Sequence, residues 1–191
     1  LAEGTEPQDI AVLYRSNAQS RVLEHRLFTA GVPYRVYGGL RFFERQEIKH
    51  VLAYLRLVHN PNDDTSWLRV VNFPTRGIGA RSIEQLSELA HNYQCSLYRA
   101  VPFMTGAAAN RLATFVQLLQ QMAHAAQGMT LPELVQFVTK HSGLAEYYEG
   151  QREGQERLEN LQELVNAAAV FVQEEGIADH AAGQIPVDAH A

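Results

Sequence analysis

Apolar side chains recur at helical spacing through most of this chain, and this periodicity restricts what the chain can fold into. In residues 47–58, for example, positions 48, 51, 52, 55 and 58 are apolar and share one face of a helix. The same pattern predicts five further helices, over residues 67–73, 82–93, 108–126, 131–140 and 155–174. We therefore expect an all-helical domain over residues 46–175, followed by a flexible linker or tail over residues 176–191.

The first 45 residues have a different pattern. Residues 9–14 are a short apolar run, residues 18–30 have helical spacing, and residues 32–37 alternate as a strand does. Strand, helix and strand in this order predict a parallel βαβ unit. Because two or three strands do not make a stable sheet alone, the rest of the sheet is expected elsewhere in a longer protein. The expected fold class is thus mainly α, with a small, partial α/β part over residues 1–45.

Charge is distributed unevenly along the chain, although the formal net charge is −5. Residues 10–81 contain eleven Arg or Lys against five Asp or Glu, whereas residues 101–191 contain four against eleven. The distribution indicates a basic surface in the first part and a solvated acidic part after it. A basic surface of this kind suits contact with a nucleic-acid backbone.

Several classes of protein are excluded by what the sequence lacks. The single cysteine, Cys95, excludes an intramolecular disulfide and zinc sites built on cysteine pairs. There is no apolar run of the ~18 residues that cross a bilayer and no signal-peptide pattern, so we expect a cytoplasmic protein without membrane contact. The chain begins with Leu1 rather than Met, which suggests that it is cut from something longer.

No motif for catalysis is present in the sequence. It contains no GxxxxGK[ST] phosphate-binding loop, no metal-ligand spacing among its eight histidines and no nucleophile-elbow pattern. We therefore expect no catalytic residue, no metal site and no cofactor in this chain. A metabolic enzyme is the weakest interpretation for the same reason.

A Gly-Ile-Gly turn between two predicted helices is the clearest local motif. It is typical of a helix-hairpin-helix element, in which glycines let the backbone approach another chain and free N–H groups at the next helix accept a phosphate. Such an element contacts the duplex backbone without sequence preference. The candidate residues are Thr75, Arg76, Gly77, Ile78, Gly79 and Arg81. The alternative is an ordinary turn whose glycines supply positive φ.

Two other stretches mix polar, basic and aromatic residues. Arg15 and Asn17 follow the first predicted strand, where open α/β sheets bind ligands, although capping of the next helix is an alternative role. Arg41 and Lys49 lie in a stretch that interleaves aromatic and basic residues, as nucleic-acid surfaces do. The aromatic rings there are equally consistent with packing between two domains.

Four ordered blocks carry a resemblance to a known family. They are residues 10–21 (IAVLYRSNAQSR), 33–49 (PYRVYGGLRFFERQEIK), 52–61 (LAYLRLVHNP) and 73–80 (FPTRGIGA). In order and spacing they resemble the UvrD/PcrA/Rep superfamily 1 DNA helicases. Residues 157–164 (RLENLQEL) resemble a later stretch of the same proteins.

The resemblance implies a parent protein that is an ATP-driven 3′-to-5′ translocase on single-stranded DNA, with ATP and Mg²⁺ as cofactors, acting in DNA repair or replication. Residues 1–45 would belong to its second RecA-like domain, called 2A. Residues 46–175 would form the helical accessory domain, called 2B. The motifs that bind and close on ATP are not in this chain, so hydrolysis would belong to the parent alone.

The resemblance also implies site residues and partners. Asn17, with Arg15 beside it, would lie in the single-strand channel, and the Gly77-Ile78-Gly79 turn would grip the incoming duplex. Arg41 and Lys49 are further candidates for backbone contact. The expected partners are single-stranded and duplex-junction DNA, with DNA-repair proteins as additional candidates. The alternative function is a protein-interaction or autoinhibitory module that binds through its acidic helical surface.

Overall fold

The described residues form helices joined by loops. The computed structural model describes residues 5–6, 9–15, 17–36 and 42–174, and within these ranges it contains no strand. The mainly α prediction is therefore confirmed. The α-helices are α1 (Asn17–Thr29), α2 (Gln46–His59), α3 (Asp64–Val70), α4 (Ala80–Asn92), α5 (Leu97–Ala100), α6 (Ala107–Ala125), α7 (Leu131–His141), α8 (Leu144–Glu149) and α9 (Gly154–Glu174). Two 3-10 helices are η2 (Phe42–Glu44) and η3 (Val101–Phe103).

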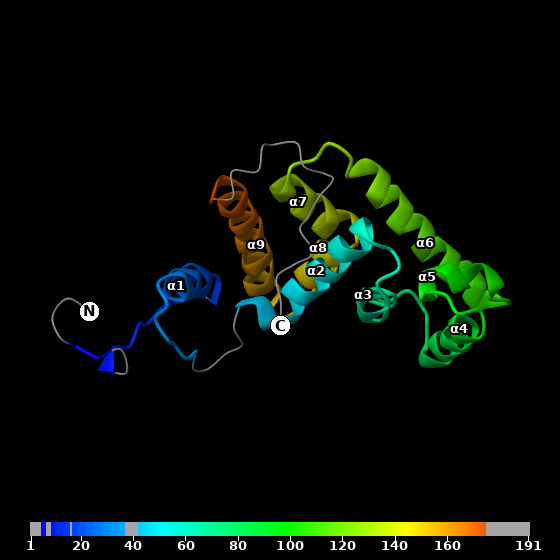
Figure 1. The fold of residues 1–191 in the computed structure, drawn as a ribbon, viewed down its shortest axis with the longest axis horizontal. Coiled ribbons are helices and arrows are strands. Elements are labelled where there is room, and N and C mark those ends of the chain that lie inside the picture. Colours follow the sequence, from blue (N-terminus) through cyan, green and yellow to red (C-terminus); the bar gives the residue numbers. More distant parts are fainter. Residues whose placement is uncertain (1–4, 7–8, 16, 37–41, 175–191) are drawn as a thin grey trace.

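Helix α2 lies at the centre of the helical domain and packs against α3, α6, α7 and α9. Its broad apolar face explains this position, because Ile48, Val51 and Tyr54 are fully buried. In Figure 1, α7, α8 and α9 lie on one side of α2, and α4, α5 and α6 extend from the other. Helix α1 lies beyond α9, at the opposite end from α4.

Helix ends follow their local sequence signals. The Thr-Leu-Pro-Glu sequence of residues 130–133 has the pattern of a capping box, and it forms one at the start of α7: the Glu133 carboxylate accepts hydrogen bonds from the N–H and the hydroxyl of Thr130, both at 2.8 Å. At α3 the carboxylate of Asp63 accepts from the Ser66 N–H at 3.0 Å. Notably, α4 begins at Gly79 without any side-chain cap.

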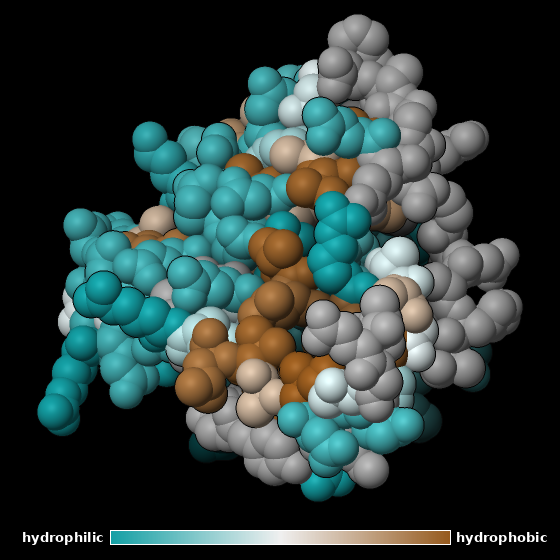
Figure 2. All heavy atoms as spheres, turned by 90° about the vertical axis from the view of Figure 1, so that its left-hand side faces the viewer, coloured by the Kyte–Doolittle hydropathy of each residue, from teal (hydrophilic) through white to brown (hydrophobic). Residues whose placement is uncertain are grey.

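The two predicted strands do not form in the part of the chain that the structure describes. Residues 10–14 and 32–36 have no regular secondary structure there. The physical reason is that a strand is stable only when neighbouring strands accept its hydrogen bonds. The apolar side chains that a sheet would cover are consequently exposed, with Leu13 at 95% and Phe28 at 79%. Figure 2 shows apolar side chains gathered on this end of the molecule.

A buried polar network joins segments that are far apart in the sequence. Arg45 donates to the side-chain oxygen of Asn160 at 2.8 Å and to the Ser20 hydroxyl at 3.1 Å, and Asn160 donates to the Glu47 carboxylate at 2.7 Å. Arg21 on α1 adds an ion pair with Glu163 on α9. The network explains why the block FFERQEIK contains two buried charged residues, Arg45 and Glu47: the block RLENLQEL supplies their buried partner, Asn160.

Removing the amide at the centre of this network tests its contribution to stability. Asn160→Ala leaves Arg45 and Glu47 buried with fewer partners, so we expect the free energy of unfolding to fall by about 2–4 kcal/mol. Urea denaturation measures this change. As a control, Gln162→Ala on the exposed face of the same helix is expected to shift it by less than about 0.5 kcal/mol. If both variants lose the same small amount of unfolding free energy, Asn160 does not stabilise the fold through this network.

Candidate nucleic-acid interface

The loop between α3 and α4, residues 71–79, is held from inside by one asparagine. The side-chain oxygen of Asn72 accepts hydrogen bonds from the N–H groups of Arg76 (2.9 Å) and Ile78 (3.1 Å). The Ile78 side chain is 1% exposed and belongs to the main core. The central residue of the Gly-Ile-Gly motif is thus an anchor for the turn, and its side chain is not available to a ligand.

The Arg76 guanidinium forms a second, stronger anchor. Nη1 donates to the carbonyl oxygens of Val70 (3.1 Å) and Pro74 (3.0 Å). Nη2 donates to the Tyr54 hydroxyl (2.7 Å) and to the carbonyl oxygen of Ser142 (3.0 Å). Four acceptors from α2, α3, the turn and the α7–α8 junction therefore surround one cation. Arg76 was predicted to add charge to a phosphate contact, but its placement makes it part of the framework of the turn.

Aromatic rings complete the environment of Arg76. Its Cζ atom lies 5.1 Å from the ring centre of Phe115 and 5.8 Å from that of Tyr54, within cation–π range. Burial raises the pKa of Tyr54 to about 12, against the lowering effect of the Arg76 charge. The phenol therefore stays protonated, and it donates to the Phe73 carbonyl oxygen at 2.6 Å while accepting from Arg76.

A histidine supports the turn from behind without adding charge. The His50 ring stacks on Phe73 at 3.9 Å, and its Nδ1 atom lies 2.7 Å from the Tyr148 hydroxyl. Burial, together with the positive charges of Arg69 and Arg157, lowers the pKa of His50 to about 4. The imidazole is consequently neutral at pH 7, and its role here is packing.

The outward side of the turn presents backbone groups and cations. Gly77 has φ of +71°, a conformation that other residues rarely adopt, and its carbonyl oxygen accepts from Arg111 Nη1 at 2.8 Å. Gly79 is the N-cap of α4, and no acidic residue lies in the first turn of that helix. The N–H groups of Ser82 and Ile83 donate to the Gly79 carbonyl oxygen, which leaves those of Ala80 and Arg81 to donate to a bound anion, where the helix dipole also favours negative charge. Thr75 and Arg81 are exposed on either side.

Among the remaining predicted residues, none of those that the structure describes is hydrogen-bonded to this turn. Arg15 is exposed, and its backbone N–H donates to the Gln19 side chain at 3.1 Å. Asn17 begins α1, but its side chain lies outside the described residues, as does Arg41. Lys49 is half-buried in the first turn of α2. Because α1 and α4 occupy opposite ends of the molecule (Figure 1), Arg15 and Asn17 belong to a separate surface.

Arg111 is the candidate residue that the sequence did not reveal. It lies one turn into α6 and is exposed, and it reaches Gly77 across 34 positions of sequence. Its neighbours in sequence form an ordinary amphipathic helix, so no local signal marks it. Only the packing of α6 against the domain places it at the turn.

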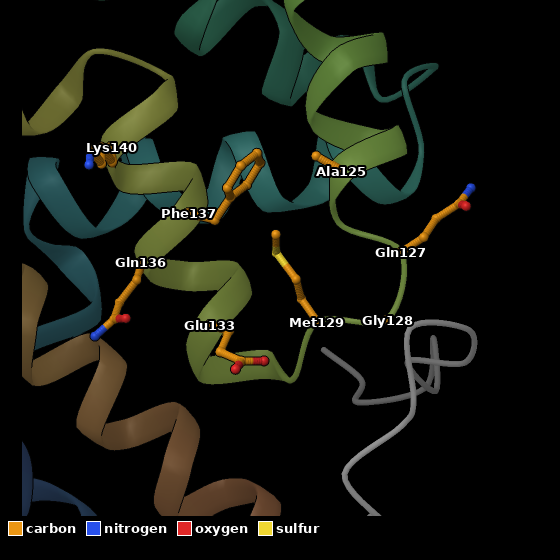
Figure 3. Close-up of a pocket in the computed structure, with 8 residues that line it drawn as sticks. All are labelled: Ala125, Gln127, Gly128, Met129, Glu133, Gln136, Phe137 and Lys140. Atoms are coloured by element: carbon orange, nitrogen blue, oxygen red, sulfur yellow. The ribbon is translucent and has the colours of Figure 1, made fainter.

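A wider hollow of the described surface lies away from the turn. It has a volume of about 540 Å³ between the end of α6 and α7, and Figure 3 shows Met129 and Phe137 pointing toward each other across it. Its carboxylate, Glu133, is occupied by the capping box. A second hollow of about 380 Å³ lies directly beside the turn, against the α7–α8 junction. The polar groups converge at the turn rather than in the larger hollow, so the turn is the better candidate site.

The described ranges offer neither a metal site nor a membrane span. No three His, Cys, Asp or Glu side chains gather there in an arrangement that holds a metal ion. None of the described helices is long and apolar enough to cross a membrane.

Comparison with known proteins agrees with the resemblance seen in the sequence. A family model described as the UvrD-like helicase C-terminal domain matches residues 1–182. DNA helicase II of Escherichia coli is 47% identical over 171 residues, which cover 85% of this chain and 24% of that protein. DNA helicase II of Haemophilus influenzae is 46% identical over 181 residues (91% and 25%), and the ATP-dependent DNA helicase PcrA of Bacillus subtilis is 39% identical over 172 residues (86% and 23%).

These matches define the chain as part of a helicase C-terminal domain. It belongs to the UvrD/PcrA family of UvrD-like DNA helicases. The chain spans about a quarter of the length of the curated relatives it matches.

The framework role of Arg76 predicts a selective loss of stability. Arg76→Lys keeps the charge but loses the planar fork that serves four acceptors, so we expect the free energy of unfolding to fall by about 2–3 kcal/mol. Arg81→Lys, on the exposed side of the same turn, is the matched control and is expected to change it by less than about 0.5 kcal/mol. If the two variants unfold at the same denaturant concentration, Arg76 does not act as an internal anchor of the turn.

Proposed function

We propose that this chain is the DNA-contacting part of an ATP-dependent 3′-to-5′ DNA helicase that acts in DNA repair or replication in the cytoplasm. Membership of the UvrD/PcrA family supports this proposal, since the relatives are named DNA helicase II and ATP-dependent DNA helicase PcrA. ATP and Mg²⁺ would be held by parts of the whole protein beyond this sequence, which has no phosphate-binding loop of its own. Unwinding is accordingly a property of the whole protein.

The burial of apolar side chains supports a division into two domains near residue 45. The helices from α2 to α9 share one apolar core, which suits a self-contained accessory domain over residues 46–175. Among the described residues of 1–45, Phe42 alone belongs to that core, and apolar side chains such as Leu13 and Phe28 are exposed, as expected for a piece of a RecA-like domain whose sheet partners lie elsewhere in the whole protein. We propose that residues 9–14 and 32–37 become strands of that sheet.

The main support for the proposed DNA contact is the start of α4, which has no side-chain cap and lies on a rigid turn. Gly77 and Gly79 present backbone, Arg81 presents positive charge, and Thr75 presents a hydroxyl, while no acidic residue lies in the first turn of α4. These groups suit one strand of a duplex backbone and carry no base-reading side chain. We propose that α3, the turn and α4 act as a helix-hairpin-helix-like element on the duplex.

A second contact would lie at the other end of the molecule. By resemblance, Asn17 and Arg15 would bind the single strand, with Arg41 and Lys49 as further backbone contacts. The separation of α1 from α4 in Figure 1 suits a substrate with both parts, a duplex next to a single-stranded tail. A junction DNA is therefore the substrate class that we propose.

Replacing Gly79 with aspartate is expected to weaken DNA binding without destabilising the fold. Gly79 has φ of −81°, and an added Cβ would meet nothing within 4 Å, so Gly79→Asp fits and caps α4. Its carboxylate would occupy the position of the phosphate and repel it. We expect the dissociation constant for a fluorescent hairpin duplex to rise at least about tenfold, a loss of about 1.4 kcal/mol, at unchanged or higher thermal stability.

The matched control is Gly79→Ala, which keeps the N–H groups free and is expected to bind within about twofold of the unsubstituted chain. Binding by Gly79→Asp as tight as that of the unsubstituted chain would refute the duplex contact. So would a failure of the unsubstituted chain to bind the hairpin even at ~20 mM salt, where phosphate contacts are strongest.

A further inference from the structure

The Arg111 side chain touches the turn from a different helix. Its Nη1 donates to the carbonyl oxygen of Gly77 at 2.8 Å, and a Cβ placed on Gly77 would lie 3.4 Å from its Nε. Arg111 is nevertheless exposed, and it forms no ion pair with the described acidic residues. It is a solvent-facing cation fixed beside the proposed DNA contact.

From this placement we infer that Arg111 is a second phosphate ligand of the turn, so that the duplex backbone is held from α6 as well as from α4. The inference rests on the proposed function and adds a binding residue to it. The ligand class is a phosphodiester backbone, recognised without regard to base sequence.

The chemistry of arginine supports this role. A guanidinium has five N–H donors in a rigid plane, and the bond to Gly77 uses one of them. That single bond holds the plane against the turn and leaves further donors for phosphate oxygens, which arginine binds in pairs. The bond also covers the Gly77 carbonyl oxygen, whose partial negative charge would otherwise repel a phosphate at this position.

The charge around the turn favours an anion from both sides. Arg81 lies in the first turn of α4, Arg111 lies near the start of α6, and neither helix has an acidic residue in its first turn. Two cations from separate helices therefore flank Gly77 and Gly79 without a compensating carboxylate on those turns. The Arg76 guanidinium, in contrast, points inward and donates to the carbonyl oxygens of Val70 and Ser142.

The salt dependence of duplex binding tests the inference. Arg111→Gln retains an amide that can still donate to Gly77 but has no charge. Loss of one phosphate contact makes the slope of log K against log salt less steep by about 0.9. When salt rises from ~50 to ~200 mM, the fold-loss of affinity of this variant should therefore be about 3.5 times smaller than that of the unsubstituted chain. Arg111→Lys keeps the charge and is expected to keep the slope. Arg152→Gln, an exposed arginine between α8 and α9, is the matched control and should leave the slope unchanged.

The outcomes separate this inference from the function on which it rests. If the unsubstituted chain binds, Gly79→Asp does not, and Arg111→Gln has an unaltered slope, then the turn binds DNA and Arg111 is not a ligand. If Arg111→Gln weakens binding with an unaltered slope and Arg111→Lys fails to restore it, Arg111 only shapes the turn, which also overturns the inference. No hairpin binding by the unsubstituted chain overturns the proposed function itself.

Discussion

The hydrogen bonds of the Arg76 guanidinium hold together every element that positions the turn. One cation binds oxygens of α2, α3, the turn itself and the α7–α8 junction, and lies against the ring of Phe115 from α6. A charge in this setting is tolerated only while its acceptors stay in place. Together with the two hydrogen bonds that Asn72 accepts, this side chain fixes the direction in which α4 begins and therefore the direction of its free N–H groups.

A division of tasks between neighbouring residues follows from that arrangement. Asn72, Arg76 and Ile78 face the protein and fix the turn, whereas Gly77 and Gly79 present their backbone to solvent. A rigid turn loses little entropy when it binds, which matters for a contact built from a few phosphate interactions. Anchoring residues and binding residues alternate along this short stretch of chain. The motif that the sequence suggests as one binding site therefore contains residues of both kinds.

The features predicted well from the sequence are those that depend on local interactions. The apolar stripe of α2 and the capping box of Thr130 and Glu133 involve residues within one or two turns of each other. The role of Arg76 was not predictable, because two of its acceptors, on Tyr54 and Ser142, lie 22 and 66 positions away. The strands expected in the first part of the chain failed for a related reason: their partners are not among the described residues.

The central claim is that the start of α4 binds a phosphate through its backbone, and amide NMR measures this most directly. In ¹⁵N–¹H correlation spectra of the chain titrated with a hairpin duplex, the account predicts that the amides of Gly79, Ala80 and Arg81 shift most and saturate together. It would be contradicted if these amides stayed unmoved while those of another surface, such as α9, shifted instead.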